Sequence, residues 1–156
     1  MWPDKSVSNF CHSLAVWLHR NQKDNQGVPY IKHLNSVALL LDNERFNDEY
    51  IKSAAFLHDA VEDGHITEGQ LVALGIPERV IYLVDLLTRK NGVDYFDYIK
   101  RLSVDEDAIA IKLCDLRHNQ DPSRGPIPEK RRLKYERAQA YLQAVLDHNK
   151  MLQDKP

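Results

Sequence analysis

Histidine and carboxylate side chains are crowded into one short apolar stretch, AAFLHDAVEDGH, at residues 54–65. His58 and Asp59 are adjacent, and Glu62 and Asp63 follow four residues later, one turn further along the same face of an α-helix. Apolar residues precede and follow the pair of His58 and Asp59, so we expect both side chains to point inward, where charged groups need partners. Imidazole together with carboxylate suits a divalent first-row metal ion or a magnesium-like ion.

Two further segments supply donors that could complete such a site. His33 stands near the start of the apolar stretch IKHLNSVALLLDN, and Asp115 interrupts the apolar stretch AIAIKLCDLRHN. Taken singly, a helical histidine beside an aspartate is more often structural or solvated than a ligand, and Asp115 could simply pair with Lys112. Taken together, two histidines and two carboxylates from three helices form a candidate metal site: His33, His58, Asp59 and Asp115.

These side chains need helices to position them, and helical hydrophobic spacing runs through almost the whole chain. TEGQ at 67–70 fits a capping box that starts a short helix ending at Gly75, and Pro77 suits a first helical position. Alternating strand patterns with hairpin turns are missing. The sequence predicts an all-α bundle of about seven to eight helices in a single domain, residues 1–156, with further helices over 6–22, 31–43, 48–63, 77–90, 94–102, 105–119 and 128–149.

Composition excludes several classes of protein. The chain of 156 residues is 43% hydrophobic and 28% charged, which is typical of a folded globular domain. Its formal net charge of -2 gives no reason to expect binding to nucleic acid or to a membrane surface. No export signal and no run of about 18 apolar residues is present, and two cysteines do not indicate a disulfide framework. We therefore expect a cytoplasmic protein with no membrane span.

The order H…HD…D, with its surrounding motifs, resembles the HD-domain metal-dependent phosphohydrolases. The resemblance is closest to the hydrolase domain of Rel/Spo-type (p)ppGpp hydrolases and their small stand-alone relatives, and it covers about residues 14–124. HD alone is a weak dipeptide, but its combination with an upstream PYIxH and a downstream KLxDxxHN is specific. The motifs are PYIKH at 29–33, AAFLHDAVED at 54–63, LVDLLTRK at 83–90 and AIKLCDLRHN at 110–119.

The resemblance assigns roles to the candidate site. It implies that the two histidines and two aspartates named above bind the ion, typically manganese in this family, although Mg²⁺, Fe²⁺, Co²⁺ or Ni²⁺ would also suit them. Glu62 and Asp63 match the acidic pair that serves catalysis, and we expect them to act on the attacking water rather than to bind the metal. The resemblance therefore implies water attack on a phosphorus atom.

Substrate contacts are also implied. Asn119 matches an asparagine that helps hold the nucleotide's sugar, while Lys90 or Arg89 would lie near phosphates. The basic run that starts at Arg124 is more often a solvated helix face, but Arg124 itself could turn toward a phosphate. The expected substrate-binding residues are Asn119, Lys90, Arg89, Lys23, Tyr30 and Arg124.

One loop departs from the family pattern. Alarmone hydrolases usually carry an arginine, often with a second basic residue, just before the PYI segment, and this chain has Asp24 and Asn25 there. Lys23, one position earlier, could substitute, but an aspartate has the wrong charge for a phosphate-rich ligand. This difference does not affect the candidate metal site, but it leaves open which substrate the chain binds.

Three functional hypotheses follow. The first is a metal-dependent nucleotide (pyro)phosphohydrolase, with the 3′-pyrophosphate of (p)ppGpp as the leading substrate. The second keeps the site but changes the substrate to another nucleotide or a dinucleotide cofactor. The third is a non-catalytic module that binds metal and nucleotide, against which the intact Glu62 and Asp63 argue. We expect no synthetase activity, because the chain leaves no room for a second catalytic domain, and we make no prediction of oligomeric state.

The remaining histidines are expected to be structural or to lie on the surface: His12, His19, His65 and His118. His65 stands out among them because it follows the acidic pair closely. Cys114 beside Asp115 is expected to act as a small buried hydrophobic residue.

Overall fold

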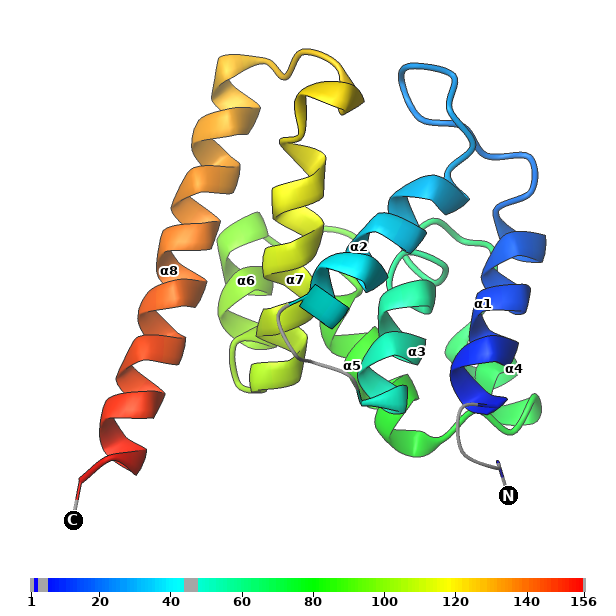
Figure 1. The fold of residues 1–156 in the computed structure, drawn as a ribbon, viewed down its shortest axis with the longest axis horizontal. Helices are drawn as coiled ribbons and strands as arrows, with labels where there is room; N and C mark the ends of the chain where they lie inside the picture. The colour runs from blue at the N-terminus through cyan, green and yellow to red at the C-terminus, as the bar shows by residue number, and fades with distance from the viewer. Residues whose placement is uncertain (1, 3–5, 44–47, 156) are drawn as a thin grey trace.

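The computed structural model describes residues 2, 6–43 and 48–155, which form eight α-helices and one short 3₁₀ helix (Figure 1). The prediction of an all-α fold with seven to eight helices is confirmed, and the described residues include no β-strand beyond an isolated bridge between Lys23 and Pro29. The elements are α1 (Ser6–Leu18), α2 (Ile31–Asn43), α3 (Glu49–Leu57), α4 (Glu68–Ala73), α5 (Glu78–Leu87), α6 (Tyr95–Leu102), α7 (Glu106–Asn119), the 3₁₀ helix η1 (Pro122–Arg124) and α8 (Glu129–Gln153).

Helix α3 lies at the centre of the bundle, in contact with α1, α2, α5 and α7. Ala54 and Ala55 are fully buried, and their small side chains let neighbouring helices approach closely, while Leu57 fills the core. Helix α2 packs on α7, and α8 runs along the outer side of α7 (Figure 1). Helices α2, α3 and α7 therefore meet, and these three carry the predicted metal ligands.

Local side-chain caps fix where several helices begin. Asp48, Asp94 and Asp105 each accept hydrogen bonds from backbone N–H groups of the first turn of α3, α6 and α7. The capping box predicted at the start of α4 is confirmed, because Thr67 and Gln70 each bond the other's backbone N–H. Each such cap stabilises a helix by about 1 kcal/mol.

The predicted continuous helix over 48–63 is wrong, because α3 ends at Leu57 and His58 is its C-cap. Residues 58–63 form consecutive turns, in which the N–H of Asp63 still bonds the carbonyl of Asp59 at 2.9 Å. A continuous helix would separate the side chains of His58 and Asp59 by about 100°. The turn instead lets both side chains face one point, and tertiary contacts there outweigh helical propensity.

Other boundaries also differ from the prediction. Helix α1 ends at Leu18 rather than residue 22, and α5 ends at Leu87 rather than residue 90. Pro77 is the N-cap of α5 rather than its first helical residue, and α8 continues to Gln153. Within the described ranges, no helix is long and apolar enough to cross a membrane.

Candidate metal centre and adjoining cavities

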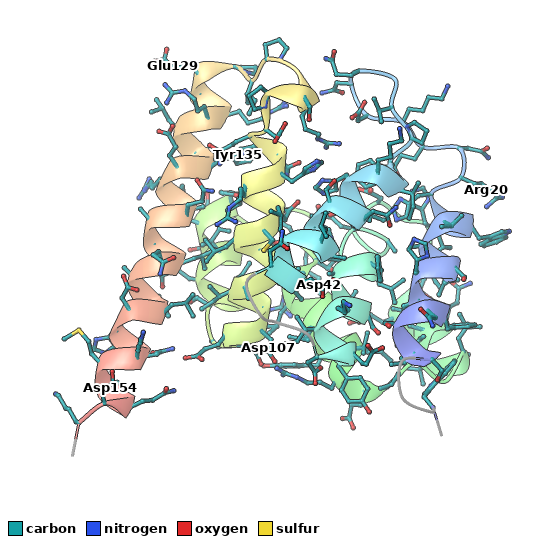
Figure 2. All side chains as sticks on the ribbon, in the orientation of Figure 1. Arg20, Asp42, Asp107, Glu129, Tyr135 and Asp154 are labelled. Carbon is teal, nitrogen blue, oxygen red and sulfur yellow. The ribbon has the colours of Figure 1, made fainter. Side chains whose placement is uncertain are left out.

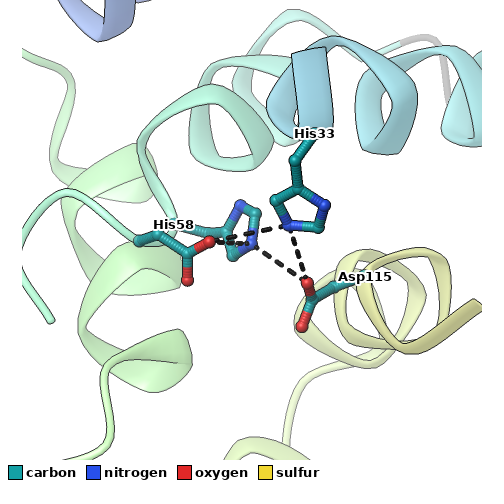
Figure 3. Close-up of side chains that lie close together, drawn as sticks. His33, His58 and Asp115 are labelled. Atoms are coloured by element: carbon teal, nitrogen blue, oxygen red, sulfur yellow. Dashed lines mark ion pairs between the residues drawn. The ribbon is translucent and has the colours of Figure 1, made fainter. Parts of the chain in front are cut away.

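The four predicted metal ligands converge at the junction of α2, α3 and α7 (Figure 3). His33 lies in the first turn of α2, His58 and Asp59 lie at the end of α3, and Asp115 lies on α7. Nε2 of His33 is 3.0 Å from Oδ1 of Asp115, and Nε2 of His58 is 3.0 Å from Oδ2 of Asp59. One donor atom from each residue lies within 4.8 Å of all the others. The structure thus brings the whole predicted set together.

The donor atoms are arranged as a metal site requires. His33 and His58 are each only 1% exposed, and each Nε2 faces carboxylate oxygens 3.0 Å away without the angles of a hydrogen bond. Buried polar atoms that face one another in this way are favourable only when a proton or a cation lies between them. Two such nitrogens facing two carboxylate oxygens fit a first-row divalent ion.

Further hydrogen bonds orient these ligands. Nδ1 of His58 is 2.6 Å from the carbonyl oxygen of Ala55, an acceptor that holds the proton on Nδ1 and leaves Nε2 free to bind. The hydroxyl of Tyr30 donates to Oδ2 of Asp59 at 2.6 Å. Tyr30, a predicted substrate contact, therefore also supports a candidate metal ligand.

His118 is a site residue that sequence reasoning missed, because it was assigned to the structural or surface histidines. Its Nδ1 lies 2.7 Å from Nδ1 of His33. Its position three residues after Asp115 places it near the ligand face of α7, and that spacing was the available signal.

Asp115 has two supporting contacts in addition to His33. Lys112 donates from Nζ to Oδ2 at 2.7 Å, and Asn119 donates from Nδ2 to Oδ1 at 2.9 Å. The alternative pairing of Asp115 with Lys112 is therefore present alongside the contacts to histidine. Both Lys112 and Asn119 also line the cavity beside the metal centre.

The four candidate ligands compensate one another's charge. Burial alone would raise the pKa of the Asp59 and Asp115 carboxyls, but the two histidines hold the pKa of Asp59 well below the usual range, and Lys112 and the histidines do the same for Asp115. Burial alone would lower the pKa of His33 and His58, and here the two aspartates raise it. Protons on the imidazoles thus provide positive charge where a cation would otherwise bind.

The predicted acidic pair borders a cavity of about 260 Å³ that opens beside the metal ligands. A carboxylate oxygen of Glu62 accepts the backbone N–H of Arg89 at 2.7 Å, and Oδ2 of Asp63 accepts from Nε2 of Gln22 at 3.0 Å. Burial, together with the charges of Asp59 and Asp63, raises the pKa of Glu62. A carboxylate with a raised pKa is a stronger base, which suits proton transfer.

Basic and aromatic side chains line the rest of this cavity, and Lys134 of α8 is among them. The basic run of α8 is therefore not only a solvated face. The hydroxyl of Tyr95 is buried and has no hydrogen-bond partner among the described residues. The lining residues beyond the ligands and the acidic pair are Tyr30, Arg89, Tyr95, Tyr98, Lys112, Asn119, Lys134 and Tyr135.

A second, smaller cavity of about 150 Å³ adjoins the first, and both are lined by Asn119 and Tyr135. Figure 2 shows Tyr135 on the side of α8 that faces α7. Arg124 lines this second cavity, where its Nη1 lies 3.1 Å from Oδ2 of Asp24. Oδ1 of Asp24 accepts the backbone N–H groups of Gln26 and Val28. Asp24 thus shapes its own loop and neutralises Arg124.

Two predicted substrate contacts lie elsewhere. Lys90 donates to Asp85 at 2.7 Å, and Lys23 is exposed on the loop before α2. Neither residue is among those that line the two cavities. Arg89, Asn119, Tyr30 and Arg124 do line them, so the structure gathers four of the six predicted contacts.

Known proteins match this chain in sequence. The chain is 33% identical, over an alignment of 134 residues, to a probable guanosine-3′,5′-bis(diphosphate) 3′-pyrophosphohydrolase of Synechocystis, which covers 79% of this chain and 17% of that protein. It is 36% identical, over an alignment of 114 residues, to the Homo sapiens guanosine-3′,5′-bis(diphosphate) 3′-pyrophosphohydrolase MESH1, which covers 67% of this chain and 63% of MESH1. The chain spans 17% of the length of each of the first curated relatives that it matches.

The fold is also similar to a solved structure, described as a metazoan ortholog of SpoT that hydrolyzes ppGpp and plays a role in starvation responses. The similarity has a TM-score of 0.74 at 27% sequence identity and covers 94% of this chain and 88% of that one. The family model described as HD domain matches residues 12–122. This match includes all four converging ligands and the acidic pair, and the chain belongs to the HD-domain family.

Proposed function

We propose that this chain is a metal-dependent nucleotide pyrophosphohydrolase, with the 3′-pyrophosphate of (p)ppGpp as its leading substrate and Mn²⁺ as its ion. The observation that carries the proposal is the convergence of two buried imidazole Nε2 atoms and two carboxylates on one point, beside a cavity lined by acids and cations. The printed names of the Synechocystis protein and MESH1 support the choice of substrate.

In this proposal, His33, His58, Asp59 and Asp115 hold the ion. A divalent ion in such a site lowers the pKa of water and offsets negative charge on phosphoryl oxygens. Glu62, with its raised pKa, takes a proton from the attacking water. The water oxygen bonds to the phosphorus next to the sugar, and the bond from that phosphorus to the sugar oxygen breaks. The sugar oxygen keeps the electron pair and takes up a proton, which balances the one accepted by Glu62, so that a sugar hydroxyl and pyrophosphate are released.

Three cations of the cavity are available to the phosphates. Arg89, Lys112 and Lys134 come from different parts of the chain and line the same space. Burial and the charges of Arg89, Arg131 and Lys112 lower the pKa of Lys134, so an anion placed among these residues relieves their mutual repulsion. Tyr95, whose ring lies 4.5 Å from Nζ of Lys134, offers a face on which a base or sugar can pack.

A second candidate keeps the reaction and changes the substrate to another nucleotide or a dinucleotide cofactor. It is favoured by the carboxylate of Asp24, which pairs with Arg124 in the smaller cavity. A neutralised arginine attracts a second phosphate group less strongly than a free one. The two candidates differ in how many phosphates the smaller cavity accepts.

The test is a screen with manganese of (p)ppGpp, ordinary nucleotides and dinucleotide cofactors, with the released pyrophosphate or phosphate measured by chromatography. Glu62→Gln and Asp63→Asn should each lower turnover by about 10²–10⁴-fold, because positioned proton transfer contributes that much. Both variants should still bind the ion, whereas Asp115→Ala should not. Asp97→Asn, an exposed carboxylate on α6, is the matched control.

Two results would overturn the proposal. Wild-type protein that binds no divalent ion under any condition would remove the metal centre. Protein that binds both the ion and a nucleotide, yet releases neither phosphate nor pyrophosphate, would instead establish the non-catalytic binding module.

A further inference from the structure

We propose a second cation site, formed by His19, Asp63 and His65 and closed by the side chain of Gln22. One donor atom from each of the first three residues lies within 4.8 Å of the others. None of the four belongs to the metal centre described above. Asp63 alone also lines the larger cavity, so the second site would share one residue with the reaction cavity.

The amide of Gln22 lies where the three donors converge. Its Oε1 is 2.6 Å from Nδ1 of His19 and 2.7 Å from Nε2 of His65, while its Nε2 donates to Oδ2 of Asp63 at 3.0 Å. The two imidazole rings meet edge to face, with centroids 4.7 Å apart. A cation held by these three residues would occupy the space that the amide fills.

His19 supplies the buried ligand of the second site. It is 2% exposed, its Nδ1 lies 2.6 Å from the amide oxygen of Gln22, and its other ring nitrogen, Nε2, is buried without a hydrogen-bond partner among the described residues. Burial is the main reason that the pKa of His19 is lowered, which favours the neutral ring that metals bind. A buried, neutral imidazole beside a second histidine and a carboxylate has the composition of a metal site.

The site is accessible and can adjust. A surface depression lined by Gln22, Gly64 and His65 reaches the cluster from outside, on a route separate from the larger cavity. Donor atoms arranged tetrahedrally at about 2.0–2.1 Å from a zinc ion lie roughly 3.3 Å from one another. The donor atoms of His19, Asp63 and His65 must therefore move closer together when an ion binds. His65 is exposed and follows Gly64, whose φ of 74° only glycine adopts easily, so this turn can carry the movement.

The donor set favours a zinc-like ion. Two imidazoles and one carboxylate, with the Gln22 oxygen or water as a fourth ligand, suit Zn²⁺ or Co²⁺ better than Mn²⁺. Binding would engage the carboxylate of Asp63 and separate it from Gln22. The consequence, which rests on the proposed function, is that excess Zn²⁺ inhibits hydrolysis by withdrawing Asp63 from the reaction cavity.

The experiment counts Co²⁺ ions by equilibrium dialysis and follows their visible absorption. Wild-type protein should bind two ions per chain, and His65→Ala should bind one, with the loss of one set of absorption bands. His148→Ala, an exposed histidine on α8, is the matched control and should bind two. The exposed position of His65 makes its replacement compatible with folding, which circular dichroism checks. Equal stoichiometry and affinity in His65→Ala and wild type would overturn the site.

A second measurement addresses the inhibition. The Zn²⁺ concentration that halves hydrolysis by the manganese-loaded enzyme should rise at least tenfold in His65→Ala, each variant being compared with its own zinc-free rate. Equal values in the two proteins would overturn the inhibitory role. The cobalt count does not depend on turnover, so failure of the proposed function and failure of the second site are distinguishable.

Discussion

Replacement of His118 tests whether its contact with His33 supports the metal centre. Burial and the positive charges of His33 and Arg124 lower the pKa of His118. This favours the neutral ring, whose unprotonated Nδ1 can accept a hydrogen bond. At 2.7 Å from Nδ1 of His33, it accepts that N–H and directs the opposite nitrogen of His33 to the ion. Losing such a contact typically weakens metal binding by about 10–100-fold, or roughly 1.4–2.7 kcal/mol.

The assay is isothermal titration of metal-free protein with Mn²⁺ at constant pH. His118→Leu should bind the ion with an affinity lower by the factor given above and with unchanged stoichiometry, because all four ligands remain. His118→Gln keeps an acceptor oxygen and should recover most of the affinity, while His12→Ala, which removes a histidine bonded to Asn35, should match wild type. A merely structural role would lower the melting temperature without separating the Leu and Gln variants in affinity.

The reasoning is refuted if His118→Leu, shown to be folded, binds Mn²⁺ within twofold of the wild-type affinity. That result would mean that packing around His33, rather than the contact between the two rings, holds the ligand in place.

Three further predictions concern pH, the smaller cavity and stability. Burial is the largest single effect on the pKa values of His33 and His58 and lowers them, but Asp59 and Asp115 together outweigh it and raise both values, so below those values an ion must displace protons. The affinity for the ion should therefore fall as the pH falls, by up to about tenfold per displaced proton and per pH unit. Calorimetric titration in buffers of different ionisation enthalpy should detect the released protons. An affinity that does not depend on pH would contradict this prediction. Asp24→Asn removes the charge that neutralises Arg124 but keeps an oxygen that accepts the loop N–H groups. Steady-state kinetics should therefore show that the KM for a polyphosphate nucleotide falls by roughly 2–5-fold. An unchanged or higher KM would contradict this prediction. Thr67→Ala removes the capping box of α4 and should lower the free energy of unfolding by about 0.5–2 kcal/mol. Chemical denaturation measures this loss, with Ser103→Ala as the comparison variant. Equal stability of the two variants would show that this cap is dispensable.

Much of the metal centre was readable from the sequence, because its donor types are rare in apolar surroundings. His33, His58, Asp59 and Asp115 each interrupt apolar helical stretches, and a buried charge in such a place needs a partner. The helices themselves followed from the same spacing, since an amphipathic pattern with a 3.6-residue period is a local property. The capping box at Thr67 was predictable for the same reason.

What local patterns did not show is where the chain bends to meet distant segments. The helix end at Leu57 is one such place, because the apolar spacing continues through Val61 while the backbone of residues 58–63 forms turns. Nothing in the basic run that starts at Arg124 distinguishes Lys134 from a solvated residue, because its place over the cavity depends on how α8 packs.

The sequence by itself determined the family, the helical fold and the four side chains that can hold an ion, because each is written in local residue type and spacing. Only the tertiary structure brought His118 onto His33, paired Arg124 with Asp24, and assembled His19, Gln22, Asp63 and His65 around one point. Those contacts join residues 41 to 100 positions apart, with the exception of His19 and its near neighbour Gln22. Such pairs meet only when the helices pack. Hydrophobic spacing specifies which face each helix buries. It does not specify which polar side chains at the helix ends will then come into contact.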